Sequence, residues 1–285
     1  MFDAAALKQY VGRRVELEDV IAASQVQRLN ATLDIKAPWP QPGEEVPPGW
    51  HYLFFPKLRL TSALGEDGMV PEMENGPPDP LPIRLFAASR QKFHRPLRIG
   101  ERARQVTELT SLTPKEGRSG RLVFATYRHS ISTPLGLAVE DEWDIVFVEG
   151  SKDASKAPPP GQPAPRQMAW ERSIDPSPVL LFRFSAVTFN SHRVHYDLPY
   201  AREAEHYPEL IVQGPLTAIC LLGLARERNP GRAVSAFEMR AKAPLFAGKP
   251  FRIGGSPCED GKGCDLWAIT PDDTIAMEAM ATFAG

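Results

Sequence analysis

Two stretches of this chain intersperse β-branched and aromatic residues with polar residues. The first runs from residue 122 to residue 148 and is broken by a proline- and glycine-containing turn at 133–136. The second runs from residue 265 to residue 283 and is broken by a turn at 270–273. Such residues are typical of strands, and a short turn returns the second strand antiparallel to the first. The pattern therefore predicts two antiparallel hairpins.

A different spacing predicts helices. Apolar residues recur near helical spacing at Leu216, Ile219, Cys220, Leu221 and Leu224. This predicts a helix over residues 216–226, and we interpret residues 83–90 as a corresponding helix earlier in the chain. An antiparallel sheet with one polar face needs cover on the other face, and these helices are the available cover. We therefore expect an α+β protein in which curved sheet wraps around a central helix.

Proline marks the organisation of the chain. The 29 prolines cluster at residues 38–48, 71–82 and 158–165. Proline neither donates to a sheet ladder nor fits inside a helix, so the last cluster predicts an extended linker. We place a boundary near residue 155, which gives halves at 1–155 and 156–285.

The two halves resemble weak copies of each other. Each is expected to contain a short helix, a loop, a long helix and then strands, in that order. The landmarks are residues 31–34 and 96–100 in the first half and residues 187–190 and 244–248 in the second. The shared order predicts an internal duplication.

Composition excludes several functional classes. The 285 residues include 33 Lys and Arg against 35 Asp and Glu, so overall charge does not favour binding to nucleic acid or to an anionic membrane. We find no apolar run of transmembrane length and no secretory signal at the N-terminus. The three cysteines, Cys220, Cys258 and Cys264, are odd in number and lack zinc spacing. We therefore expect a cytoplasmic protein with reduced thiols and no metal.

The strongest chemical signal is a polar loop. Titratable and polar side chains crowd into residues 190–197 directly behind an apolar run. Short polar side chains such as Asn190 and Ser191 compete for backbone hydrogen bonds and end regular structure. His192 and His195 are therefore expected where a packed core meets a cavity, as in an active-site loop.

Six segments of the chain, one of which contains this loop, resemble a known family. The similar segments are residues 48–55, 93–100, 115–120, 188–197, 212–216 and 243–246. They resemble MaoC-like double-hotdog hydratases and dehydratases, in particular the hydroxyacyl-thioester dehydratase type 2 branch that includes itaconyl-CoA and mesaconyl-C4-CoA hydratases. The resemblance implies a double hotdog, two antiparallel sheets each wrapped around a long central helix. It also implies that the first half supplies scaffold and acyl pocket and that the second half is catalytic.

The resemblance further implies roles for individual residues. The family motif places an aspartate five residues before a histidine, and Asn190 and His195 occupy those positions here. An amide takes no proton, which leaves His195 as the general acid/base of the motif. Gly214 matches the glycine whose backbone N–H binds the thioester oxygen at the start of the central helix. The substrate is an acyl-CoA thioester, and no cofactor is expected beyond the coenzyme A that the substrate carries.

Several further residues are candidates for substrate binding, each with a plain structural alternative. If His195 is not catalytic, it is a structural histidine. His192 lies either within the site or only at its edge. Arg193 and Arg202 are candidates for the coenzyme A phosphates, or solvated surface residues. Arg84 is the favoured partner of a second substrate carboxylate because it would begin the helix over residues 83–90. Arg90 and Arg193 are the alternative partners. If Arg84 is not a partner, it is an exposed, solvated residue. His51, His94 and His129 are interpreted as structural.

The predicted function is hydration of an enoyl-CoA, with itaconyl-CoA or mesaconyl-C4-CoA giving citramalyl-CoA. A hotdog thioesterase is an alternative, but the helix over residues 216–227 has its only acid at the far end. A 3-hydroxyacyl-thioester dehydratase of fatty acid metabolism and a non-catalytic acyl-binding protein also remain open. A further homodimer is compatible with the fold but is not required, because an internal duplication pairs the two halves within one chain.

Overall fold

A computed structural model describes residues 7–70, 75–77, 80–81, 83–117, 120–149 and 161–285 of the protein. The linker prolines 158–160, the boundary at residue 155 and part of the 71–82 cluster lie outside these residues. The described strands are β1 Arg14–Val20, β2 Ile83–Phe93, β3 Arg102–Gly117, β4 Gly120–Thr133, β5 Gly136–Val148, β6 Trp170–Ile174, β7 Val234–Ala241, β8 Phe251–Pro257, β9 Gly263–Ile269 and β10 Ile275–Phe283. The described helices are α2 Ala23–Thr32, α3 Pro178–Val187, α4 Leu198–Glu203 and α5 Gly214–Arg228, with 3-10 turns η1 Trp50–Leu53, η2 Thr61–Ala63 and η3 Arg193–His195.

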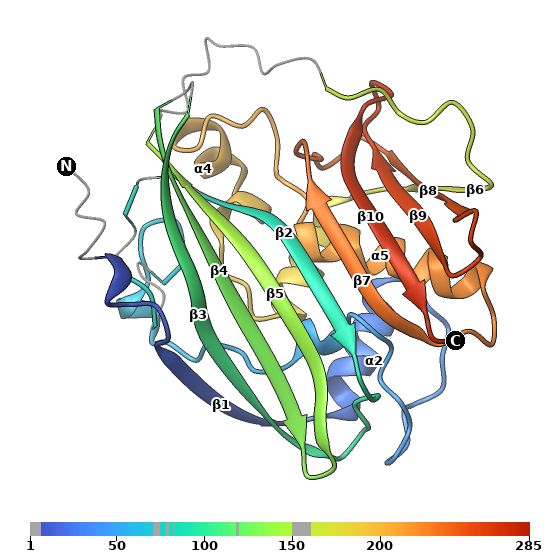
Figure 1. The fold of residues 1–285 in the computed structure, drawn as a ribbon. Helices are drawn as coiled ribbons and strands as arrows, with labels where there is room; N and C mark the ends of the chain where they lie inside the picture. Colours follow the sequence, from blue (N-terminus) through green and yellow to red (C-terminus); the bar gives the residue numbers. More distant parts are fainter. Residues whose placement is uncertain (1–6, 71–74, 78–79, 82, 118–119, 150–160) are drawn as a thin grey trace.

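All ten described strands form one antiparallel sheet in the order β1-β3-β4-β5-β2-β7-β10-β9-β8-β6 (Figure 1). The strands before the linker occupy one half of the sheet, and the strands after it occupy the other. The halves join where β2 pairs with β7, with Ser89 opposite Met239. Both predicted hairpins are confirmed, as β4–β5 and as β9–β10.

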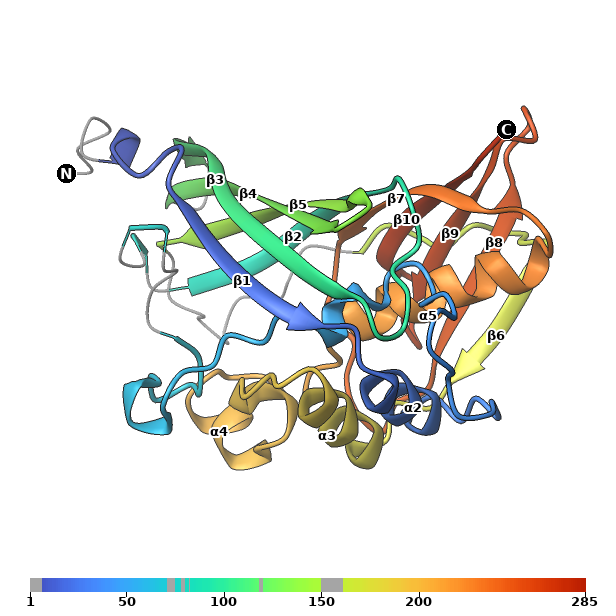
Figure 2. The same ribbon diagram turned by 90° about the horizontal axis from the view of Figure 1, so that it is seen from below.

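The helices form two layers beneath the sheet. Helix α5 lies against the second half, and α2, α3 and α4 lie side by side below it (Figure 2). The predicted helix over residues 216–226 is therefore confirmed and slightly longer. Its side chains are buried on nearly every face, as expected for a helix enclosed by a sheet on one side and helices on the other.

The helix predicted over residues 83–90 is wrong. These residues belong to strand β2, which pairs with β5 along one edge and with β7 along the other. A short apolar run cannot be assigned to helix or strand by its periodicity, and here hydrogen bonding on both edges decides the outcome. The first half accordingly has no long central helix among the described residues, and η1 and η2 lie in the segment before β2 instead.

The duplication is visible in local backbone geometry. Helices α2 and α3 each end two residues before a residue in the left-handed region, Asp34 with φ 56° and Phe189 with φ 53°. This match pairs Asp34 with Phe189, one residue away from the landmarks 31–34 and 187–190, and it places Ile35 and Pro40 where the second half has Asn190 and His195. The first half thus has the same backbone turn after its helix but lacks the polar side chains that follow it in the second half.

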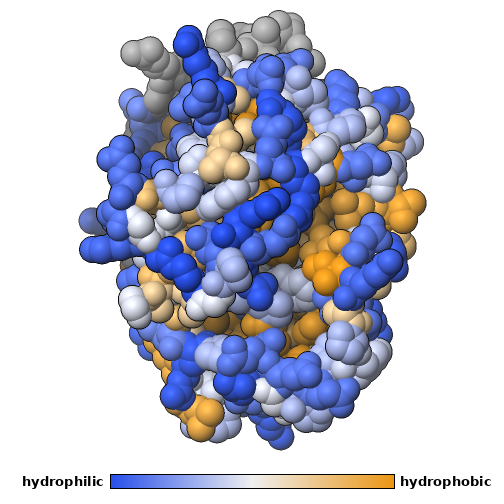
Figure 3. Space-filling view, turned by 90° about the vertical axis from the view of Figure 1, so that its right-hand side faces the viewer, coloured by the Kyte–Doolittle hydropathy of each residue, from blue (hydrophilic) through white to orange (hydrophobic). Residues whose placement is uncertain are grey.

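The main hydrophobic core extends through both halves and includes Leu29, Leu221 and Phe237. A second cluster, with Leu109, Tyr127 and Phe147, lies under the first half of the sheet. Seen from the β6 edge, hydrophilic residues cover most of the surface, with smaller hydrophobic areas between them (Figure 3). No helix within the described residues is long and apolar enough to cross a membrane.

Candidate active site

The predicted loop begins at the end of α3. Ser177 caps the start of this helix by accepting a hydrogen bond from the Leu180 N–H, and Phe189 ends it with a left-handed backbone. The Asn190 N–H then donates to the Ser185 carbonyl over 2.8 Å. The side-chain Oδ1 of Asn190 accepts from the His192 N–H over 3.1 Å. The Asn190 oxygen is thus used to shape the loop, and the amide nitrogen is the end that remains to orient a ligand.

His195 is held in one tautomer. Its ring is buried, and Nδ1 lies 2.8 Å from the Ile211 carbonyl oxygen. A carbonyl oxygen only accepts hydrogen bonds, so Nδ1 carries the hydrogen and Nε2 carries a lone pair. Burial lowers the pKa of His195 to about 4, and the bond to Ile211 offsets this only in part. The imidazole is therefore neutral at neutral pH, with the lone pair of Nε2 able to accept a proton.

His192 lies beside His195, as the short spacing predicted. The two ring centroids are 5.4 Å apart, and the rings are nearly perpendicular at 86°. His192 is only half-buried, so it stands on the solvent side of the pair.

The start of α5 is tied to the same loop. The Ile211 N–H donates to the Val194 carbonyl over 3.0 Å, which brings the chain leading into Gly214 alongside His195. Gln213, which precedes the helix, is buried and donates to the Leu181 carbonyl and to Ser185 Oγ at 2.9 and 2.8 Å. Gln213 is a residue that sequence analysis missed, since its partners lie on α3.

A turn from the first half clamps the loop from the other side. Ser191 Oγ donates to the Gly68 carbonyl over 2.5 Å, and the Arg193 N–H donates to the Asp67 carbonyl over 2.9 Å. Gly68 has φ +80°, and a Cβ there would lie 2.1 Å from the Ser191 carbonyl oxygen. Only glycine fits this close backbone approach. Nothing in the local sequence around Gly68 indicated this contact.

The predicted arginines have partners within the protein. Arg193 pairs with Asp197 at 2.8 Å, donates to the Glu66 carbonyl and stacks on Tyr200. Arg202 pairs with Glu209 at 3.2 Å on the exposed side of α4. Their assignment to substrate binding stays a prediction, and Arg193 has a clear structural task in joining this loop to the first half.

Arg84 does not begin a helix, so that part of the argument for it was wrong. It lies on β2, with Nη2 3.5 Å from the Val70 carbonyl.

Aromatic side chains line the sheet next to Gly214. A Cβ at Gly214 would lie 3.7 Å from the Phe86 ring. Phe86 meets Trp143 edge to face at 5.6 Å between centroids, and Tyr52 lies 5.9 Å from Trp143. All three rings are half-buried, so they present apolar surface that a bound group can cover.

Behind these rings lies a buried polar network centred on Asp141. Its carboxylate accepts hydrogen bonds from Ser89 at 2.6 Å and Trp143 at 2.7 Å and lies 3.0 Å from His51 Nε2. Burial alone would raise the pKa of Asp141, but the hydrogen bond and charge of His51 and the bond from Ser89 hold it below its usual value. His129 is buried against Trp143, and burial lowers its pKa to about 4. Both histidines lie in the protein interior, in keeping with the structural role predicted for them.

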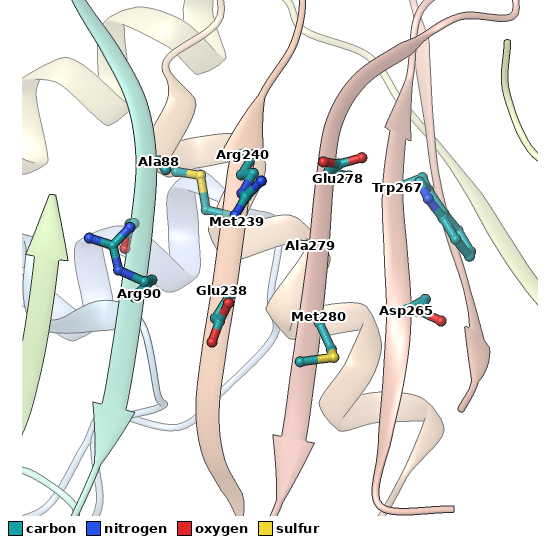
Figure 4. Close-up of a pocket in the computed structure, with 11 residues that line it drawn as sticks. Ala88, Arg90, Glu238, Met239, Arg240, Asp265, Trp267, Glu278, Ala279 and Met280 are labelled. Atoms are coloured by element: carbon teal, nitrogen blue, oxygen red, sulfur yellow. The ribbon is translucent and has the colours of Figure 1, made fainter. Parts of the chain in front are cut away.

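A shallow depression of about 300 Å³ lies elsewhere, on the outer face of the sheet (Figure 4). Its lining residues come from β2, β7, β9 and β10 and include Arg90, Glu238, Arg240, Trp267 and Glu278. Helix α5 lies behind these strands (Figure 4), and none of the predicted catalytic residues is among the lining residues. Arg90 projects here and pairs with Asp144 at 2.6 Å and with Glu142. It is therefore on the wrong side of the sheet to meet an acyl group at Gly214.

Solved structures identify the architecture. HtdX of Mycobacterium tuberculosis matches with a TM-score of 0.65 at 19% identity, over 95% of this chain and 100% of that one. A MaoC-like dehydratase from Phytophthora capsici matches with a TM-score of 0.67 at 12% identity, over 99% of each chain. A second Mycobacterium tuberculosis protein, described as a double hotdog fold, matches with a TM-score of 0.58 at 15% identity, over 96% of each chain. The protein has the double hotdog fold, as the resemblance implied.

Sequence relatives are more specific. The family model for hydroxyacyl-thioester dehydratase type 2 matches residues 49–247. Mesaconyl-C(4)-CoA hydratase of Chloroflexus aurantiacus is 41% identical over 276 residues, 97% of each chain. The mitochondrial hydroxyacyl-thioester dehydratase type 2 of Schizosaccharomyces pombe is 26% identical over 270 residues, covering 84% of this chain and 89% of the relative. The chain belongs to the hydroxyacyl-thioester dehydratase type 2 family, and it is accordingly a hydro-lyase.

Proposed function

We propose that the protein hydrates a C5-dicarboxylic enoyl-CoA, and that mesaconyl-C4-CoA, giving citramalyl-CoA, is its substrate. The observation that carries the proposal is the 41% identity to a mesaconyl-C(4)-CoA hydratase over 97% of both chains. The site geometry supports it, because a neutral histidine with a free Nε2 lies next to the N-terminus of a buried helix. Itaconyl-CoA also carries a second carboxylate and is the second substrate to test.

In the proposed reaction the thioester oxygen accepts a hydrogen bond from the Gly214 N–H. A helix N-terminus presents unpaired N–H groups and the positive end of its dipole, which stabilise the negative charge that develops on that oxygen. His195 Nε2 takes a proton from water while the water oxygen bonds to the β-carbon. The imidazolium then gives this proton to the α-carbon as the enolate collapses, so the water molecule is fully accounted for.

Asn190 takes part through hydrogen bonding alone, because an amide does not exchange a proton at neutral pH. We assign its amide nitrogen to orienting the water or the thioester. All proton transfer then falls to His195.

The proposal requires no cofactor other than the coenzyme A of the substrate. We also place the protein in the cytoplasm, and the unpaired Cys220, Cys258 and Cys264 support a reducing compartment. A homodimer remains compatible with the reaction.

The test is to incubate the protein with mesaconyl-C4-CoA, itaconyl-CoA, crotonyl-CoA and a long-chain 3-hydroxyacyl-CoA. Loss of enoyl absorbance without release of thiol is the expected result. Release of free thiol would instead identify a thioesterase, and activity confined to long-chain 3-hydroxyacyl thioesters would identify a fatty acid dehydratase. If neither signal appears with any of these thioesters, the catalytic proposal is wrong and acyl binding alone remains.

A further inference from the structure

The β2–β5 register places two aromatic rings on the inner face of the first half. Phe86 lies opposite Ile145, and Ser89 lies opposite Trp143. Residues directly opposite in an antiparallel pair project to the same face of the sheet. Ser89 and Ile145 are buried, so Trp143 and Phe86 also project to the inner, concave face.

Phe86 connects these rings to the proposed oxyanion site. Its ring lies 3.7 Å from the position that a Cβ on Gly214 would take. Trp143 meets Phe86 edge to face at 5.6 Å between ring centroids, and Tyr52 lies 5.9 Å from Trp143. Each of the three rings keeps part of its surface accessible. Trp143 is therefore one ring removed from Gly214, on the side where β2 covers the start of α5.

The ring of Trp143 is anchored by a buried carboxylate. Trp143 Nε1 donates to Asp141 Oδ2 over 2.7 Å, and Asp141 is fully buried. Ser89 Oγ donates to the other carboxylate oxygen over 2.6 Å, and His51 Nε2 lies 3.0 Å from Oδ2. These contacts fix the carboxylate, and its bond to the indole N–H holds the ring in one orientation.

The same network holds Tyr52. Gln91 Nε2 donates to the Tyr52 hydroxyl over 2.9 Å and to Ser89 Oγ over 3.1 Å. The Tyr52 ring also stacks on His51 at 4.6 Å between centroids. Replacing a buried ionic network by apolar residues is often neutral or stabilising, so stability alone does not account for this one. Its common effect is to fix the rings of Trp143 and Tyr52.

We propose that Trp143 closes the acyl end of the site and restricts the protein to short acyl groups, and that Asp141 is a positioning residue that holds the Trp143 ring in place. The inference rests on the proposed hydratase function and adds what selects the length of its substrate. An acyl group whose thioester oxygen is at the Gly214 N–H and which passes along Phe86 meets the Trp143 ring next. A longer chain has to displace this large ring and leave Asp141 without one of its donors, which is costly for a buried carboxylate.

The experiment compares kcat/KM for octenoyl-CoA with kcat/KM for crotonyl-CoA, which has a shorter acyl chain. Trp143→Ala removes the ring, whereas Trp143→Phe keeps a ring that cannot donate to Asp141. The matched controls are Trp267→Ala and Trp267→Phe, since Trp267 is also half-buried on a strand but lines the depression on the outer face.

The unsubstituted protein should strongly prefer crotonyl-CoA. Trp143→Ala should raise the ratio of octenoyl to crotonyl activity by about tenfold or more, since a pocket discriminates even a single methylene on this scale. Trp143→Phe should raise the ratio by a smaller factor, because the ring remains but is no longer anchored. Both Trp267 variants should keep the ratio of the unsubstituted protein. A purely structural role of Trp143 would leave this ratio unchanged.

A double variant tests whether Asp141 acts through Trp143. Asp141→Asn puts an amide nitrogen where a donor already points, so it should loosen the ring and raise the octenoyl to crotonyl ratio. In the Trp143→Phe background the same substitution should have no further effect on the ratio, because the bond that it weakens is already absent. An unchanged ratio for Asp141→Asn alone, or a further rise in the double variant, would overturn the positioning role.

The possible failures are distinguishable. If the unsubstituted protein hydrates none of the enoyl-CoA substrates, the proposed function fails. If it hydrates octenoyl-CoA as readily as crotonyl-CoA, or if Trp143→Ala leaves the ratio unchanged, the length limit at Trp143 is wrong while the hydratase function stands. Should Trp143→Ala not fold by circular dichroism, Trp143→Phe decides the question through its activity ratio.

Discussion

His195 donates from Nδ1 to the carbonyl oxygen of Ile211 over 2.8 Å, three residues before the start of α5. This one bond sets the tautomer of the proposed base and joins the loop over residues 190–197 to the chain that leads into Gly214. The base and the proposed oxyanion site are therefore positioned by a common segment.

Replacing His195 with alanine should abolish hydration. The substitution removes the only acid/base group that we assign to the reaction, and such groups contribute on the order of a hundred- to ten-thousand-fold. The rate of loss of enoyl absorbance measures the effect, and circular dichroism checks the fold. A folded variant with near-normal turnover would refute the assignment.

Hydration should persist into mildly acidic solution. Protonation removes the Nε2 lone pair, so activity falls as the pH drops through the pKa of His195, which burial lowers to about 4. Between pH 7.5 and 5.5 we therefore expect kcat/KM for crotonyl-CoA to stay nearly constant. A histidine with the ordinary pKa of about 6.5 would retain only about a tenth of its basic form at pH 5.5. A tenfold decline across this range would contradict the lowered pKa of His195.

Asn190 should tolerate one replacement better than another. Asn190→Ala removes both the bond to the His192 N–H and the amide nitrogen, so activity should fall severely. Asn190→Asp keeps an acceptor for the His192 N–H and matches the family motif, so partial activity is expected. Steady-state kinetics of both variants provide the measurement. If Asn190→Ala retains normal activity, Asn190 serves only to form the turn.

Gly68→Ala should impair catalysis although Gly68 lies in the first half, far along the chain from the proposed catalytic residues. A Cβ there would collide with the Ser191 carbonyl and displace the catalytic loop, and a shift of about 1 Å can cost on the order of a hundred-fold in rate. Gly43→Ala is the matched control, because Gly43 has a similar φ of +85° and no atom within 4 Å of its Cβ position. Equal activity of the two variants would show that the close contact between Gly68 and Ser191 is not needed for catalysis.

Stability should decline as the pH falls below about 6.5. Burial lowers the pKa of both His129 and His195 to about 4, so between these values the unfolded chain binds more protons than the folded one. Two such groups give a slope of up to about 2.7 kcal/mol per pH unit in the free energy of unfolding. Asp141 acts in the same direction at lower pH, because its pKa is lowered in the folded state and its contribution is lost on protonation. Urea midpoints between pH 7 and 4.5 test this, and His129→Gln should roughly halve the slope.

Local pattern was sufficient for much of the fold. The interspersed strand residues located both hairpins, and the spacing of Leu216, Ile219 and Leu224 located α5. Each of these signals depends on neighbours within one element, whose periodicity is preserved in the linear sequence. The polar loop from Asn190 to His195 was predictable for the same reason, since a cluster of short polar residues behind an apolar run favours the end of a helix.

The assignment of residues 83–90 required information from elsewhere in the chain. Their apolar run suits a buried helix as well as a buried strand, and only pairing with β5 and β7 excludes the helix. The side of the sheet to which Arg84 and Arg90 project follows from that pairing as well.

The sequence by itself determined the elements and the chemical groups of the catalytic loop, because those properties are local. Only the tertiary structure decided how the site is assembled. Gly68 and Ser191 are separated by 123 residues, and Gln213 reaches Leu181 on another helix. Likewise the neutrality of His195 comes from burial beneath elements that its own segment does not contain. Such contacts arise when the sheet and helices pack together, and the periodicity of the sequence does not predict them.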